Sequence, residues 1–270
     1  MSPPSAAATL LRHALAAPGP EIDLAGAALA CAAMERPALD LAPYHGHLDE
    51  LARDVAAAAR PPPEALAHAF GAVHGYRGDR DSYDDLANAD LARVIDRRKG
   101  LPVALSILWI HAARAQGWRC AGLDAPGHFV IRLAAGGRES VLDPFDGGRA
   151  LDADALRTLL RRVAGPAAAA TADRLEAVDD RSVLLRLQNN LKLRLAQAGR
   201  HTDALAVVER MLVIAPRAIG LWREAAALNA EGGALRAALG CLETAMALAA
   251  GTDARQRIAA DIAALSGRLN

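Results

Sequence analysis

Residues 125–133 read APGHFVIRL, and this stretch decides the fold of the middle of the chain. The Pro-Gly pair predicts a turn, and the alternating apolar residues after it predict a β-strand that begins at His128. The block VLDPFDGG at residues 141–148 places Asp143 on a second short strand, and the AAGGR between the blocks is typical of a hairpin. We therefore expect His128 and Asp143 to lie side by side on neighbouring antiparallel strands.

A helix that is apolar almost all round precedes these strands. It is predicted over LPVALSILWIHAARAQG, residues 101–117, where Pro102 suits the first helical turn and Gly117 ends the helix. A helix of this kind lies in the centre of a domain rather than on its surface. With WRCAGLDA, residues 118–125, as a further strand, the sequence predicts an α+β core with a small antiparallel sheet.

The segments before this core predict helices joined by turns. Residues up to about 70 are rich in Ala and Leu, with prolines at 37, 43 and 61–63, and HLDELARDVAAAA places Leu48, Leu51, Val55 and Ala59 on one helical face. Residues 74–91, HGYRGDRDSYDDLANADL, predict loop and turn. The basic RRK at 97–99 is interpreted as a solvated helix end, with attraction of an anion to the next helix as the alternative.

The last part of the chain is helical and repeats itself. Gly199 recurs as Gly233 and Ala204 as Ala238, each 34 residues later, which is the period of a tetratricopeptide repeat. Gln188 stands where Trp222 does, and Pro216 closes the first unit. The sequence predicts two helix pairs and a final capping helix. PAAAATA, residues 166–172, predicts a linker before them.

Composition narrows the class of protein. The 270 residues include 31 Lys plus Arg and 31 Asp plus Glu, and this balance argues against binding to nucleic acid or to a membrane surface. The longest uncharged apolar run is too short to span a bilayer, and no signal peptide is evident. Three cysteines without paired spacing predict neither a disulfide framework nor a zinc site, and they fit the cytoplasm.

A histidine beside an aspartate is half of a catalytic triad. A thiol or hydroxyl nucleophile needs an imidazole to take its proton and a carboxylate to orient that imidazole. The nucleophile should stand at the N-terminus of the buried helix, where the helix dipole stabilises a thiolate.

Four blocks in this order resemble the bacterial SirB-type family: RRKGLPVALSILWIHAAR, APGHFVIRL, LDPFDGG and NNLKLRLAQAGRHTDALAVVERML. That family joins a transglutaminase-like domain of the papain type to C-terminal tetratricopeptide repeats. The resemblance implies that His128 and Asp143 match the superfamily's catalytic His and Asp. Active members carry cysteine where this chain reads Gly100-Leu101-Pro102, and the SirB-type family generally carries proline there. The resemblance therefore implies that the nucleophile is missing.

Two other residues are poor substitutes for that nucleophile. Ser106 lies one helical turn beyond Pro102, where a hydroxyl in an apolar helix tends to bond to the preceding turn. Cys120 is expected to be a buried thiol. No metal site or cofactor is predicted, because one His and one carboxylate are too few ligands and His111 has no evident partner.

The predicted organisation has three parts: residues 1–165 form a transglutaminase-like domain, 166–181 a linker, and 182–270 the repeats with their cap. The expected function is non-catalytic binding of a protein or peptide partner, and a thiol-hydrolase or acyl-transferase with an unidentified nucleophile stays open. Arg132 alternates with His128 along the strand, so both should share a face, with Arg132 near Asp143 or clamping a partner's carboxylate. The residues expected around the pocket are Gly100, Pro102, Ser106, Pro126, Gly127, Phe129, Arg132, Pro144, Phe145 and Asp146.

Overall fold

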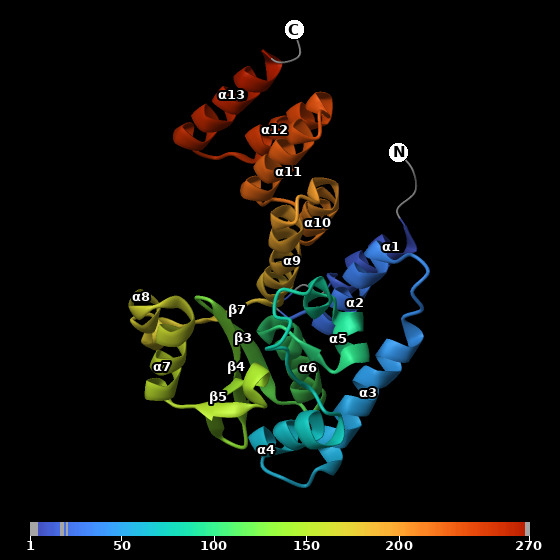
Figure 1. The fold of residues 1–270 in the computed structure, drawn as a ribbon, viewed down its shortest axis with the longest axis vertical. Helices are drawn as coiled ribbons and strands as arrows, with labels where there is room; N and C mark the ends of the chain where they lie inside the picture. The colour runs from blue at the N-terminus through green and yellow to red at the C-terminus, as the bar shows by residue number, and fades with distance from the viewer. Residues whose placement is uncertain (1–4, 17–18, 20, 268–270) are drawn as a thin grey trace. The chain divides into compact units, whose positions relative to one another are not determined.

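The computed structural model describes residues 5–16, 19 and 21–267. The chain divides into two compact units, Met1–Leu187 and Gln188–Asn270 (Figure 1). Helices predominate in both units, and the sheets lie in the first. The α+β, mostly helical class predicted from the sequence is confirmed.

The first unit begins with short helices built from Ala and Leu. They are α1 Ala6–Ala14, α2 Leu24–Glu35, α3 Ala42–Ala57, α4 Pro62–Ala67 and the π-helix η1 His68–Val73. In α3, Leu48, Leu51 and Val55 are buried as predicted. Ala59 is not part of that face, because α3 ends at Ala57 and Ala59 is exposed in a left-handed conformation (φ 47°).

Helix α6, Pro102–Ala115, is the central element of the first unit. Pro102 occupies its first turn, and nearly every side chain from Pro102 to Ala113 is buried, as an all-round apolar helix requires. It follows η2 Leu86–Ala89 and α5 Leu91–Arg97. Two residues of the predicted loop, β1 Arg77–Gly78, pair in parallel with β2 Lys99–Gly100 just before α6.

A five-stranded sheet carries the predicted His and Asp. Its strands are β3 Arg119–Ala125, β4 His128–Ala135, β5 Arg138–Asp143, β6 Arg149–Leu151 and β7 Ala177–Val178, in the order β6-β5-β4-β3-β7. Neighbouring strands are antiparallel throughout. Helix α6 packs against β3 and β4, and α7 Ala153–Ala164 covers the other face of the sheet (Figure 1).

The segment predicted as a linker, 166–181, is folded into the first unit instead. It contains α8 Pro166–Ala169, the 3-10 turn η4 Ala172–Arg174, β7 and the start of α9. Ala168 and Ala172 are buried in one apolar cluster with Leu156, Leu159 and Leu160 of α7. Small side chains let this segment lie close to α7. Alanines that are typical of a linker are therefore part of the packed core here.

The second unit is a stack of helix pairs. Helix α9, Asp180–Gln197, crosses the boundary between the units, and α10 His201–Ile214, α11 Ile219–Glu231, α12 Leu235–Leu248 and α13 Thr252–Ser266 follow. Gly199 and Gly233 take the left-handed conformation (φ 71° and 79°) between the helices of successive pairs. Ala204 and Ala238 are fully buried. The predicted repeat pairs and capping helix are confirmed. Among the described helices, none has both the length and the apolar character that crossing a bilayer demands.

Candidate functional site

His128 and Asp143 form a buried hydrogen-bonded pair at one end of the sheet. The Nε2 atom of His128 lies 3.0 and 3.1 Å from the two carboxylate oxygens of Asp143. The residues are only 7% and 3% exposed. The Asp143 carboxylate also accepts the Phe145 amide at 3.0 Å, which fixes its orientation. Since Nε2 is held by the carboxylate, Nδ1 is the ring nitrogen left without this partner, the reverse of the Ser-His-Asp triad, in which the carboxylate holds Nδ1.

Phe145 covers this pair. It lies in the 3-10 turn η3, Pro144–Asp146, and its ring makes an edge contact with the His128 ring at 5.9 Å. The Arg80 guanidinium lies 5.1 Å from the centre of the Phe145 ring and donates to Asp146 at 2.7 Å. The Tyr83 ring also makes an edge contact with the Phe145 ring, with 5.9 Å between the ring centres. The predicted Phe145 and Asp146 therefore lie beside the pair, and their role as a pocket rim stays a prediction. Sequence reasoning missed Arg80 and Tyr83, because a polar loop gives no signal of which residues fold back.

The position expected for a nucleophile is taken by Pro102 at the start of α6. Gly100, two residues earlier, is buried, and Leu101 is the helix N-cap. An added Cβ at Gly100 would meet the Val94 side chain at 2.7 Å, so this approach to the helix is tightly packed.

Ser106 and two of the three cysteines are buried. Ser106 is 0% exposed, and its Oγ has no hydrogen-bond partner among the described residues, so the expected bond to the preceding turn is not formed. Burial raises the pKa of the Cys120 thiol to about 12, although Arg114 partly opposes the shift. Cys31 is also buried, and Cys241 in α12 is half-buried.

The remaining predicted pocket residues take mainly structural positions. Pro126 and Gly127 form the turn between β3 and β4, where Gly127 has a φ of 71°. Phe129 is buried on the face of β4 opposite His128. The Arg132 guanidinium donates to the carbonyl oxygen of Leu175 at 3.0 Å, so its bond goes to the chain before β7 and not to Asp143.

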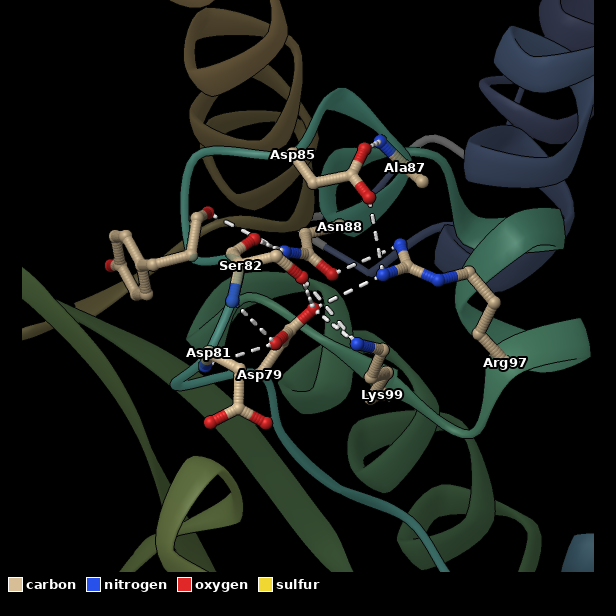
Figure 2. Close-up of polar contacts among 9 residues, drawn as sticks. Asp79, Asp81, Ser82, Asp85, Ala87, Asn88, Arg97 and Lys99 are labelled. Atoms are coloured by element: carbon tan, nitrogen blue, oxygen red, sulfur yellow. Dashed lines mark hydrogen bonds and ion pairs between the residues drawn. The ribbon is translucent and has the colours of Figure 1, made fainter.

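The basic residues 97–99 are partly buried and make ion pairs and hydrogen bonds, so this stretch is not a solvated helix end (Figure 2). Arg97 and Lys99 both reach the carboxylate of Asp79, at 3.1 and 3.0 Å. The Asp79 carboxylate also accepts the hydroxyl of Ser82 at 2.7 Å and its amide at 3.0 Å. Asn88 accepts from Arg97 at 3.2 Å and donates to the Ser82 carbonyl.

This Asp79 network holds the loop 79–85 beside the beginning of α6. The Asp79 amide donates to the Gly100 carbonyl at 3.2 Å, and the Leu101 amide donates to the Asn88 carbonyl at 3.1 Å. A Cβ at Gly78 would meet Phe145 at 2.6 Å, so the same loop touches the cover of the His-Asp pair. The network therefore supports the site from the side of Pro102.

One group among the described residues brings together side chains of metal-ligand type: His47, Glu50 and His74. It lies outside the His128 site. His111, for which the sequence suggested no metal-binding partner, is not part of this group. Burial lowers its pKa and favours its neutral form.

Comparisons with known proteins agree with both units. Residues 42–189 match the family model described as transglutaminase-like superfamily, and residues 191–270 match a tetratricopeptide repeat model. No solved structure matches this chain.

Several curated proteins are similar in sequence. A protein of Xylella fastidiosa named UPF0162 protein is 37% identical over 145 residues, which are 53% of this chain and 52% of that protein. The UPF0162 protein of Pseudomonas aeruginosa is 31% identical over 70% of this chain and 71% of its own length. F-box only protein 21 of Mus musculus is 32% identical over 71 residues, 26% of this chain and 11% of that protein.

The match to the Xylella fastidiosa relative spans about half the length of that protein. The transglutaminase-like model nevertheless covers more than half of the chain, and the Pseudomonas aeruginosa relative is matched over most of its length. With a His-Asp pair beside a buried helix and a repeat region after it, this chain belongs to the transglutaminase-like superfamily, in the SirB-type family whose members are named UPF0162 proteins.

Proposed function

We propose that this chain is a non-catalytic member of its superfamily that binds a protein or peptide partner. The observation that carries the proposal is Pro102 in the first turn of α6. The resemblance places the superfamily's cysteine there, and a proline side chain offers neither a thiol nor a hydroxyl for covalent catalysis.

The surroundings of Pro102 support the same reading. A reactive cysteine needs thiolate character and access to substrate. Cys120 has neither, because it is buried and its pKa is raised to about 12. Ser106 of α6 is fully buried and has no access to substrate. The His128–Asp143 bond then ties two strands together.

The repeats supply a docking surface. Stacked helix pairs form extended concave surfaces that proteins of this kind use for binding. Within the second unit, α11, α12 and α13 enclose a hollow of about 490 Å³ that is lined by alanines, with the Arg223–Asp261 ion pair at its edge. We place partner binding at this unit.

Chemical labelling tests the missing nucleophile. We expect iodoacetamide at neutral pH to modify Cys241 slowly, to leave Cys120 intact, and to act equally on wild type and His128→Ala. A fluorophosphonate probe should leave Ser106 unmodified. Peptide mass spectrometry reads out each position. Modification of Cys120 or Ser106 that disappears in His128→Ala would overturn the non-catalytic proposal.

Partner capture tests the binding half of the proposal. Cross-linked partners recovered with the full chain from its native cell should be lost when residues 198–270 are removed. Their purified forms should bind wild type directly, and Arg223→Ala together with Asp261→Ala should weaken that binding. Retention of every partner by the shortened chain would contradict docking on the repeats.

The intact His128–Asp143 geometry favours one alternative, a thiol-hydrolase or acyl-transferase that uses another nucleophile. The hydrogen bond between Nε2 and Asp143 holds the ring and leaves Nδ1 as the nitrogen that could act as a general base. His128-dependent labelling in the experiment above is the outcome that would establish it.

A further inference from the structure

Two histidines and a glutamate meet on the N-terminal side of the first unit, on elements that the proposed function does not use. His47 and Glu50 stand one turn apart on α3, and Asp54 follows one turn further along the same helix. His74 directly follows the π-helix η1, and its imidazole meets the His47 ring edge-on at 5.2 Å. π-Helical turns frequently mark functional sites.

The spacing of the ligand atoms suits a small metal ion. One nitrogen from each histidine and one carboxylate oxygen of Glu50 all lie within 4.8 Å of one another. His47 Nδ1 and Glu50 Oε2 are 2.8 Å apart, which is a hydrogen-bond distance. Two ligands on a tetrahedral Zn²⁺ with bonds of about 2.0–2.2 Å are about 3.4 Å apart, so the half-exposed Glu50 carboxylate has to move outward by about 0.6 Å to bind the ion. Both imidazoles are almost fully buried, whereas the Glu50 side chain is 50% exposed and leaves a path from solvent.

Each imidazole has a second partner that fixes which nitrogen is left for a metal. Asp54 Oδ2 lies 2.7 Å from His74 Nε2, and the Tyr76 hydroxyl lies 3.0 Å from His47 Nε2. Metal-bound histidines almost always hold their other nitrogen in this way, most often against a carboxylate. Both imidazoles therefore present Nδ1.

We propose that His47, Glu50 and His74 form a zinc site in which water is the fourth ligand and Asp54 and Tyr76 orient the imidazoles. Two imidazoles, one carboxylate and one open position form a ligand set that suits Zn²⁺. The ion joins α3 to the segment after η1, which leads into β1.

The positive charge of Arg98 lowers the affinity of this site for a cation. Its guanidinium contacts His47 Nε2, donates to the Tyr76 hydroxyl at 2.7 Å and lies over the Tyr76 ring. A fixed positive charge so close weakens cation binding, while Glu50 and Asp54 offset it. Arg98 can only donate, so His47 Nε2 accepts from it in this structure and Nδ1 carries the proton toward Glu50. When zinc takes Nδ1, the proton of His47 moves to Nε2 and is donated to Tyr76, and the Arg98 guanidinium has to move off Nε2 while it keeps its bond to Tyr76. Removing the Arg98 charge should therefore tighten zinc binding.

Calorimetric titration of the chelator-treated full chain with Zn²⁺ tests the proposal, with the visible absorption of Co²⁺ as a second readout of coordination. Wild type should take up one ion per chain and gain thermal stability from it. His74→Ala should abolish uptake, and Asp54→Asn should weaken it about 10- to 100-fold. Arg98→Met should strengthen it.

Two variants keep the test decisive. Glu50→Gln preserves the shape of a half-exposed side chain, so its fold survives even where His74→Ala unfolds, and it should still weaken zinc binding at least about 10-fold. His45→Ala removes an exposed histidine of the same helix and should bind as wild type does. Absence of uptake by wild type, or equal losses in His45→Ala and Glu50→Gln, would overturn the site.

Discussion

Asp79 is the carboxylate on which the polar network beside α6 depends (Figure 2). Burial alone would raise its pKa, but hydrogen bonds from the Ser82 amide and hydroxyl, Lys99 and Asn88 outweigh burial and hold the pKa well below its usual range. A folded-state pKa below the unfolded one means that ionised Asp79 stabilises the fold.

Asp79→Asn should therefore lower the free energy of unfolding near neutral pH, because it removes the charge that Arg97 and Lys99 contact. The expected loss is about 2 kcal/mol, since both cations are partly exposed and keep part of their hydration. The contribution is complete above the unfolded pKa of about 3.9 and is lost as the pH falls through the lower folded value. Urea unfolding at about pH 6 and about pH 3 measures both effects.

Asp81→Asn changes an exposed neighbour and serves as the control, with an expected change within about 0.5 kcal/mol. An equal loss in the two variants, or a difference between wild type and Asp79→Asn that grows as the pH falls, would contradict the role given to Asp79.

At the scale of elements, helix α6 is held against the turn that follows η3. Gly148 lies in that turn with a φ of 82°, and a Cβ there would meet the buried Trp109 ring of α6 at 2.1 Å. The neighbouring Gly147 has a similar φ of 66° but open space around it. Substitutions at these two glycines therefore distinguish the energetic cost of backbone strain from the cost of a packing clash.

Gly148→Ala should cost about 3 kcal/mol or more, since it adds a clash with a core aromatic to the backbone strain. Gly147→Ala should cost about 1 kcal/mol, from strain alone. Denaturant unfolding of both variants gives the comparison, and near-ultraviolet circular dichroism should report movement of Trp109 only in Gly148→Ala. Equal costs would show that the turn adapts freely.

The periodic elements of the chain could be predicted from the sequence. Helix α6 is apolar on all sides, the strands around His128 alternate, and the repeats recur at a fixed period, so local pattern and final structure agree. The His128–Asp143 pairing follows from the hairpin, which requires only short-range geometry.

The features that could not be predicted depend on distant partners. Arg97 meets Asp79 from 18 positions further along the chain, with η2 and α5 between them, and no periodicity predicts such a contact. His47 and His74 meet because η1, which continues α4, packs against α3. Segment 166–172 is Pro- and Ala-rich, which is typical of linkers, yet burial of Ala168 and Ala172 against α7 decides its structure.

At the scale of the whole molecule, the chain has separate cores. Leu123, Val130 and Leu160 belong to a core of the first unit, and Leu242 and Ile258 belong to a core of the repeats. Repeat stacks take most of their stability from neighbouring helices. A cavity in one unit should therefore affect that unit first.

Leu242→Ala should destabilise the repeats by about 3 kcal/mol through the loss of a buried side chain. Hydrogen exchange by mass spectrometry should rise in α11 to α13 and stay unchanged in α6 and β4. Leu160→Ala is the reciprocal variant and should raise exchange around α7. Uniform acceleration along the chain in both variants would indicate a single cooperative unit.

The unequal burial of the three cysteines has a practical consequence. Cys31 and Cys120 are enclosed in the first unit, whereas Cys241 is partly open on α12 of the repeats. A maleimide fluorophore added to the native protein should attach at Cys241 alone, without engineering. The wild-type chain thus carries its own reporter, on the unit to which we assign partner docking.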